Sequence, residues 1–382
     1  MSTPRSGARC WRRGALAALL LIPLASGLIA ADAIKLGEVG PLTGKEAAFG
    51  QSAHKGILLA IAELNARGGV LGRPLAVVAE DNQSKPGESA TASKKLLSRD
   101  KVVALLGTGT SSNCLEMAPV AQTARVPLVA TTATADEVTA NRSYAFRVCF
   151  IDPFQGAVLA KFARDTLKAK RVALLTSVSS SYSVGLSKVF REKFAAGGGT
   201  IVADQKYSEG DKDFRAQLTA IKAARPDAIA TTGFYTEGAL ICKQARELGL
   251  TLPIVAGDGW EAPELIEIGG AAVNGAYYCS HYSSESTAPE VRDFVQRFRA
   301  KYRDTPDSMA PLAYDAVMIL AAAITKAGTT EGPRLRDALA AIKDHPGVTG
   351  RTTIDAERNA SKPAVVLAVK NGRSEFFQTI EP

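Results

Sequence analysis

The sequence predicts an α/β protein of two Rossmann-like lobes with parallel sheets. The chain has 382 residues, and a prior of roughly 100–200 residues per domain gives two domains. From residue 34 onward, short β-rich runs alternate with helical patterns in two blocks, which is typical of parallel sheets covered by helices on both faces. Three helical patterns without strands follow the second block. They have to complete a lobe begun earlier, so we expect the chain to cross between the lobes more than once.

The expected elements follow from apolar periodicity and from glycine stops. In the first helical pattern, Ile57, Ile61 and Leu64 share one face, and Gly68-Gly69 ends it. The first block holds β-rich runs at 34–39, 75–79, 102–106, 128–131 and 145–149. The second block holds runs at 171–176, 201–203, 228–232, 254–256 and 276–281. Late helices are expected at 289–302, 312–327 and 333–342, and β-like runs at 351–354, 364–369 and 375–379.

The N-terminus has the order of residues found in a secretory signal peptide. Arg12-Arg13 precedes an uncharged run at 14–31, and Ala31-Asp32-Ala33 matches an A-x-A cleavage pattern. The alternative is an uncleaved anchor, although Pro23 and Gly27 weaken the run as a membrane helix. We expect residues 1–33 to be removed and the mature protein to act in the periplasm.

Composition and motifs exclude several classes of function. Hydrophobic residues make up 46% and charged residues 22% of the chain, which excludes a disordered or integral membrane protein. The net charge is +8, but no Lys/Arg cluster is interleaved with aromatics, so no nucleic-acid partner is expected. Gly107-Thr108-Gly109 lacks the third glycine of a dinucleotide loop, and Walker and G-x-S-x-G motifs are absent. We therefore expect no enzyme, no cofactor and no metal.

Four cysteines follow the expected signal peptide: Cys114, Cys149, Cys242 and Cys279. An oxidising compartment permits disulfides, and the pairs Cys114/Cys149 and Cys242/Cys279 would each fall within one lobe. No CxxC spacing supports a metal or redox motif. Disulfides and free buried thiols both stay open at this point.

Candidate binding residues lie in the turns that follow strands, where ligands of doubly wound sheets sit. The turn at 107–113 is rich in hydroxyls and leads into a helix, whose free N–H groups attract a carboxylate. Simple N-capping explains the same residues. The turn Thr132-Ala133-Thr134 follows the next strand, so the two turns meet if their strands are neighbours.

A third turn, Gly257-Asp258-Gly259-Trp260, follows the run at 254–256. Its acid is either part of an ordinary turn or a carboxylate held for a ligand ammonium, where a charge-assisted hydrogen bond is strong. Tyr182 and Phe234-Tyr235 follow other strands of the second block. Aromatics there fit either the core of a lobe or a wall of the cleft.

Taken together, the motifs resemble the leucine/isoleucine/valine-binding family of periplasmic solute-binding proteins, which serve ATP-driven importers. The resemblance runs from about residue 34 to residue 377. The motifs that carry it are Gly40-Pro41-Leu42-Thr43-Gly44, Ala48-Phe49-Gly50-Gln51, Asn65-Ala66-Arg67-Gly68-Gly69-Val70-Leu71-Gly72-Arg73, Glu80-Asp81-Asn82-Gln83-Ser84, Ala145-Phe146-Arg147-Val148-Cys149, Lys243-Gln244-Ala245-Arg246-Glu247-Leu248-Gly249, Gly257-Asp258-Gly259-Trp260 and Ala313-Tyr314-Asp315-Ala316-Val317.

The resemblance implies a type I periplasmic binding protein with a hinge of three crossovers. These fall near 148–153, 282–284 and 345–349. One lobe then consists of residues 34–150 with 283–347, and the other of residues 151–282 with 348–382. The late helices complete the first lobe and the C-terminal strands complete the second.

The resemblance also assigns binding roles to residues of this chain. Ser111 and Thr134 match hydroxyls that hold the ligand carboxylate, and Thr134 contacts both ligand ends. The backbone carbonyl of Thr132 and the side chain of Asp258 match the ammonium partners, and Ala133 lies between the two threonines. Asp258 is shorter than the glutamate common in the family, and Ser183 replaces a common glycine after Tyr182. The wall positions, which set ligand choice, are Tyr182, Phe234, Phe49 and Met309.

We therefore expect a non-enzymatic, monomeric binding protein. It captures an amino acid, branched-chain or otherwise apolar, and delivers it to an ABC permease of the inner membrane. The first alternative is a different small ligand, such as an amide, urea or an aromatic acid. The second alternative is a sensor that reports to a regulator instead of a transporter.

Overall fold

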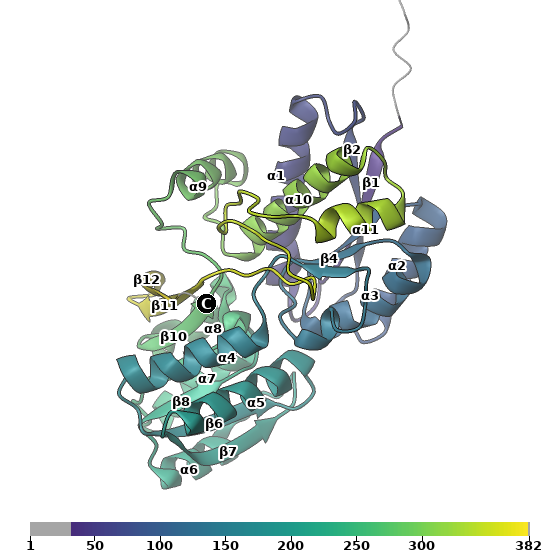
Figure 1. Cartoon of the computed structure of the whole chain (residues 1–382). Coiled ribbons are helices and arrows are strands. Elements are labelled where there is room, and N and C mark those ends of the chain that lie inside the picture. The colour runs from purple at the N-terminus through teal and green to yellow at the C-terminus, as the bar shows by residue number, and fades with distance from the viewer. Residues whose placement is uncertain (1–31, 381–382) are drawn as a thin grey trace, which may run out of the picture. The chain divides into compact units, whose positions relative to one another are not determined.

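The computed structural model describes residues 32–380 of the chain. All but two residues of the expected signal peptide lie outside the described residues. Within the described part, the strands form two sheets, shown in Figure 1. The first sheet has the strand order β2-β1-β3-β4-β5, and the second has the order β12-β11-β10-β9-β8-β6-β7. This arrangement confirms the expected α/β fold class.

All strand pairs of the first sheet are parallel. Its strands are β1 (Ile34–Gly40), β2 (Leu75–Asp81), β3 (Ala104–Gly107), β4 (Leu128–Ala130) and β5 (Ala145–Arg147). They are linked through the helices α1 (Ala47–Ala66), α2 (Glu88–Lys95) and α3 (Ser111–Ala124). Strands β3, β4 and β5 are buried along their whole length, as expected for a sheet covered on both faces.

The second sheet is parallel except at its C-terminal edge. Its strands are β6 (Arg171–Ser177), β7 (Thr200–Tyr207), β8 (Ala228–Thr231), β9 (Ile254–Ala256), β10 (Ala276–Ser280), β11 (Ala364–Lys370) and β12 (Arg373–Ile380). Strand β11 runs antiparallel to both β10 and β12. Asn371 and Gly372 form a two-residue turn with φ of 49° and 73°, and so short a turn joins only antiparallel strands. The prediction of purely parallel sheets is therefore wrong at this edge of the second sheet.

Helices α4 and α5 pack against each other beside the second sheet (Figure 1). The helices of this half are α4 (Asp152–Lys161), α5 (Ser181–Ala196), α6 (Arg215–Ala224), α7 (Tyr235–Glu247) and α8 (Pro263–Gly269). Short π-helical turns are Leu96–Asp100 and Phe162–Thr166, and short 3-10 turns are Asp136–Val138, Asp258–Trp260 and Gly270–Val273.

The late helices return the chain to the first sheet. They are α9 (Pro289–Tyr302), α10 (Met309–Ala327) and α11 (Gly332–Ala340). Helix α10 packs closely on α1, because a Cβ added to Gly56 would lie 2.0 Å from the carbonyl oxygen of Ala310. Arg297 of α9 forms an ion pair with Glu63 of α1. The chain therefore crosses between the two halves in the segments 148–151, 281–288 and 341–363.

Residues 351–354 do not form the expected strand. Thr352 makes an isolated bridge with His345, and Ile354 makes another with Ala360. Both partners lie within a few residues along the chain, so the backbone groups are satisfied locally within the third crossover and do not join a sheet.

The core contains both the cysteines and the most apolar helix of the described chain. The four cysteines of the described chain are free and buried. Burial raises the pKa of Cys114, Cys149 and Cys242 to about 12, so these thiols behave as small apolar residues. Helix α10 is long and apolar enough to span a bilayer by length and composition alone, but 78% of its apolar window is buried inside the protein. This burial is that of a core helix.

Candidate functional site

A cavity of about 280 Å³, part of which is open to solvent, lies where the turns that follow β3, β4, β8 and β9 meet the first turns of α1, α5 and α10. Its lining residues are Phe49, Gly109, Thr110, Ser111, Thr132, Tyr182, Phe234, Asp258, Gly259 and Met309. Both halves of the molecule contribute to it. The enclosed space at its centre is about 20 Å³, room for about one water molecule, so a solute fits only after the lining residues move apart.

The start of α3 forms one wall of the cavity. Thr110 caps the helix in a reciprocal capping box with Asn113, so the capping role is filled by the residue before Ser111. The Ser111 hydroxyl oxygen accepts a hydrogen bond from the Ala135 backbone N–H at 3.1 Å. Because this oxygen accepts from the protein, its own hydrogen is left to be donated elsewhere. Ser111 lines the cavity, which makes it a candidate donor to a ligand.

The two hydroxyl-rich turns meet, as their neighbouring strands β3 and β4 require. Thr132 lines the cavity and donates its hydroxyl to the Gly109 carbonyl at 2.9 Å. Ala133 and Thr134 are buried beside the cavity and do not line it. The Ala133 carbonyl accepts from the Arg147 guanidinium at 2.8 Å. Seven of the nine residues expected at the site therefore line one cavity, and the other two adjoin it.

The second half supplies the carboxylate of Asp258, which is 4% exposed. Close packing explains the glycines beside it. A Cβ at Gly257 would lie 2.1 Å from the Tyr182 hydroxyl, and one at Gly259 would lie 2.8 Å from the Gly233 carbonyl oxygen. The Gly259 backbone N–H donates to the Tyr182 hydroxyl at 3.2 Å. The turn thus needs glycine on both sides of the acid to pack against Tyr182.

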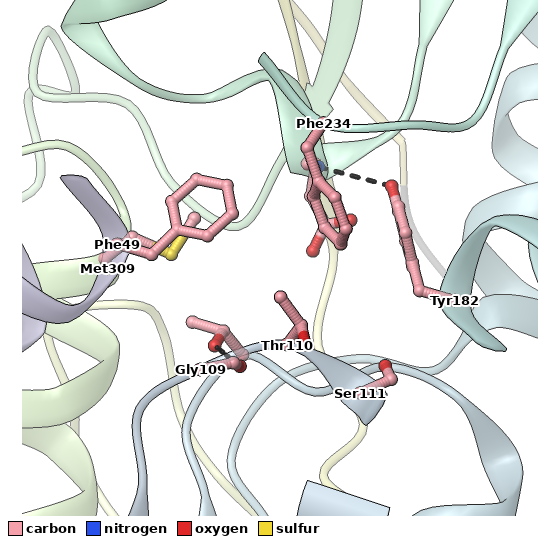
Figure 2. Close-up of a pocket in the computed structure, with 10 residues that line it drawn as sticks. Phe49, Gly109, Thr110, Ser111, Tyr182, Phe234 and Met309 are labelled. Atoms are coloured by element: carbon pink, nitrogen blue, oxygen red, sulfur yellow. Dashed lines mark hydrogen bonds between the residues drawn. The ribbon is translucent and has the colours of Figure 1, made fainter. Parts of the chain in front are cut away.

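Aromatic rings form the apolar part of the wall, as Figure 2 shows. Phe234 stacks on Tyr182 with centroids 5.5 Å apart, and Phe49 meets Phe234 edge-on at 5.9 Å. The sulfur-bearing side chain of Met309 lies beside Phe49, and Ser111 lies across the space from Phe234. A ligand in this space therefore contacts hydroxyls at one side and rings at another.

The surroundings of Asp258 are acidic. Burial, and next the charge of Asp258, raise the pKa of Asp152 well above its usual range. Burial and the charges of both acids likewise raise the pKa of Tyr182, which therefore keeps its proton. No group of three or more metal-binding side chains occurs in the described residues. The buried carboxylate of Asp258 can accept hydrogen bonds from a positively charged group.

Two residues of this region were not expected from the sequence. His281 Nε2 lies 2.9 Å from Asp258 Oδ2, and Asp152 stands at the start of α4. The three histidines, His54, His281 and His345, are far apart along the chain, so the sequence alone marks no partner for His281. The pairing arises because β9 and β10 are neighbours, which brings residues 258 and 281 together.

Contacts of Lys45 and of Ser308 join the halves around the cavity. Lys45, which precedes α1, forms an ion pair with Glu209 at 2.5 Å, and the Tyr235 hydroxyl donates to the Lys45 carbonyl at 2.8 Å. Glu261 accepts from both the backbone N–H and the hydroxyl of Ser308, at 2.9 and 2.7 Å. Burial, and next the charge of Asp307, raise the pKa of Glu261 to about 8.

Two sheets joined by three crossovers, with a small polar and aromatic cavity between the strand ends, define a solute-binding protein of the two-lobed type. The family model described as "Periplasmic binding protein" matches residues 33–373, and the chain belongs to this family. It is a periplasmic binding protein of the ABC-transporter type and not an enzyme. The resemblance stated from the motifs is thereby confirmed.

Several known proteins are similar over most of their length. The Leu/Ile/Val-binding protein BraC3 of Rhizobium johnstonii is 32% identical over 88% of this chain and 92% of its own. The leucine-binding protein LivK of Thermotoga maritima is 40% identical with a TM-score of 0.88, over 91% of this chain and 99% of its own. LivJ of Streptococcus pneumoniae, solved with isoleucine, is 36% identical with a TM-score of 0.88, over 92% of this chain and 100% of its own.

A further solved structure has a different ligand. A solute-binding protein of Rhodopseudomonas palustris, in complex with 3,4-dihydroxybenzoic acid, is 26% identical with a TM-score of 0.82. The match covers 91% of this chain and 97% of the Rhodopseudomonas palustris chain. The fold thus accommodates both amino acids and aromatic acids, and the residues of the cavity have to distinguish them.

Proposed function

We propose that this protein captures an α-amino acid with an apolar, branched side chain and delivers it to an ABC permease of the inner membrane. The observation that carries the proposal is the placement of Asp258 and Ser111 around one cavity. Asp258 Oδ1 has no hydrogen-bond partner among residues 32–380, so it is available to a ligand ammonium. The Ser111 hydroxyl and the first N–H groups of α3 are available to the carboxylate.

The wall supports the apolar side chain. Phe49, Phe234 and Met309 present carbon and sulfur to the space between the charged ends. The names of LivK and LivJ, and the isoleucine bound to LivJ, favour the same class of ligand. In this proposal the protein is a monomer of two lobes that move relative to each other, and the ligand stabilises the closed form. One lobe consists of residues 34–150 with 283–347, and the other of residues 151–282 with 348–382.

The second candidate is an aromatic acid, because the benzoate-type ligand of the Rhodopseudomonas palustris protein suits a wall of stacked rings. Such a ligand has no amine. It would leave Asp258 Oδ1 without a hydrogen-bond partner, so that His281 alone would compensate this buried carboxylate beside the second acid, Asp152. The acidic surroundings therefore favour the amino acid.

The test is calorimetric titration of the ligand-stripped chain 34–382 with leucine, isoleucine, valine, 4-methylpentanoate and 3,4-dihydroxybenzoate. We expect the amino acids to bind at least about a hundredfold more tightly than 4-methylpentanoate, which lacks only the amine of leucine. Tighter binding of 3,4-dihydroxybenzoate than of every amino acid would overturn the proposal in favour of the aromatic acid.

A further inference from the structure

His281 lies at the junction of the cavity and the crossovers. It directly follows β10, at the start of the segment 281–288 that leads to α9. Its side chain is buried, with 1% of its surface exposed. Its ring stacks on Phe150 of the segment 148–151, with centroids 3.8 Å apart and an angle of 25° between the planes. Two crossovers are therefore in contact through this histidine.

The hydrogen bond between His281 and Asp258 fixes which carboxylate oxygen is free. A carboxylate only accepts hydrogen bonds, so Nε2 carries the hydrogen and donates it to Oδ2 at 2.9 Å. Oδ1 has no partner in the described residues. The acid stands between Gly257 and Gly259, which offer it no side-chain support. The histidine therefore holds the carboxylate in one orientation.

No other described group replaces this contact. The Tyr182 hydroxyl lies near Asp258, but it accepts from Gly259 N–H and donates to Gln155 Oε1 at 3.4 Å. The buried cation Arg147 donates to the carbonyls of Ala133 and Ala135. Among residues 32–380, His281 makes the one side-chain hydrogen bond of good geometry to the Asp258 carboxylate, and the Tyr182 hydroxyl is a weaker neighbour of the same group.

His281 also faces the hinge. It lines a second cavity, whose walls also include the crossover residues 282–283, 285–288 and 346–351, the start of α9 and residues of β11 and β12. The residue that contacts Asp258 therefore belongs to the region where the chain passes between the halves.

We propose that His281 is a positioning residue for amine recognition, which holds Asp258 Oδ2 so that Oδ1 meets the ligand ammonium. This inference rests on the proposed function, since it requires a ligand with an amine. Its role is to orient the acceptor, and the ring stack on Phe150 keeps the imidazole itself in place.

Two variants separate the hydrogen bond from the packing. His281→Phe keeps an aromatic ring against Phe150 and removes the donor, whereas His281→Gln offers an amide N–H in place of Nε2 and removes the ring. We expect His281→Phe to weaken leucine binding about ten- to hundredfold, because a hydrogen bond to a charged group is lost. His281→Gln should stay within about threefold of the wild type, and 4-methylpentanoate should bind His281→Phe within about twofold of its wild-type affinity.

The measurement is titration of the chain 34–382 by calorimetry and by fluorescence of Trp260, which is the single tryptophan of that chain and belongs to the turn of Asp258. His345→Gln, in the third crossover, is the matched control, and thermal melting verifies folding. His281→Leu replaces His281→Phe if the latter does not fold. Where 4-methylpentanoate binds too weakly to measure, the contrast between Phe and Gln with leucine decides.

Three results overturn the inference: unchanged leucine affinity in His281→Phe, equal losses in His281→Phe and His281→Gln, or equal losses for leucine and 4-methylpentanoate. Failure of the wild type to bind any amino acid overturns the proposed function together with the inference. That outcome is recognisable because it appears before any substitution is made.

Discussion

On the side of the first sheet, the cavity wall consists of backbone groups and hydroxyls at the start of α3, whereas the second half contributes a carboxylate held by a histidine. The first wall is fixed by secondary structure, since the capping box of Thr110 and the bond from Ala135 N–H to Ser111 both lie within it. The second wall depends on contacts between distant side chains, such as Asp258 with His281. Substitutions should therefore have larger effects on the second wall.

The largest effect is expected from Asp258→Asn, which removes the charge and keeps the shape. Loss of one partner of a buried charge pair costs about 2–5 kcal/mol, or roughly thirty- to several thousandfold in affinity. Calorimetric titration with leucine measures it. Asp304→Asn is the control, because that acid is exposed and its contacts are an ion pair with Lys55 and the Thr305 backbone N–H. Near-native affinity of Asp258→Asn would show that the ammonium binds elsewhere.

A smaller effect is expected from Ser111→Ala. The substitution removes one donor to the ligand carboxylate, while the backbone N–H groups of α3 remain, so we expect a loss of about tenfold in leucine affinity. The Ala135 N–H also loses its acceptor, and the melting temperature should fall by about 2–4 °C. Ser112→Ala, one residue along, should leave leucine affinity unchanged. If Ser111→Ala lost as much leucine affinity as Asp258→Asn, the expected difference between the two walls of the cavity would be contradicted.

The burial of Glu261, together with the charge of Asp307, should make stability depend on pH. The pKa of Glu261 is raised to about 8 from 4.5, so its protonated form is favoured in the folded protein. Its contribution to stability is therefore fully present below pH 4.5 and is lost as the pH rises through 8. We expect the wild-type melting temperature to fall across this window more steeply than that of Glu261→Gln, by roughly 3–6 °C. Parallel curves for the two proteins would contradict the assignment.

The smallest effect is expected at the surface. Lys45 pairs with Glu209 across the two halves, but its side chain is 38% exposed. Exposed ion pairs contribute about 0–1 kcal/mol, so Lys45→Gln should change leucine affinity by less than about fivefold, and by less still in 0.5 M salt. A larger loss in calorimetric titration would mean that the closed form depends on this pair more than on the buried contacts.

Alternation of strands and helices predicted the two sheets and their covering helices, because the period of apolar residues reports on the burial of each element. The direction of β11 was not predictable by the same argument, since it is set by the two-residue turn at Asn371-Gly372. Residues 351–354 have strand-like composition, but their backbone groups bond within the third crossover. The residue pattern of a segment indicates which secondary structure it can form, whereas its hydrogen-bond partners in the folded chain determine which one it forms.

In the candidate site, too, some residues were predictable from the sequence and others were not. Ser111, Thr132 and Asp258 follow strands, and the ends of parallel strands meet at one edge, so their convergence was predictable. Their roles came from the family resemblance and stay predictions. His281 was not predictable, because nothing near it in the sequence marks a partner, and Asp258 reaches it only across neighbouring strands. Pairs of this kind depend on the register of the sheet.

A crystal structure of the chain 34–382 with isoleucine tests the central claim most directly. The account predicts the ligand ammonium within about 3.2 Å of Asp258 Oδ1, Asp258 Oδ2 still bonded to His281, and the ligand carboxylate at Ser111 and the start of α3. An ammonium bound away from Asp258, or a carboxylate turned toward the second wall, would contradict it.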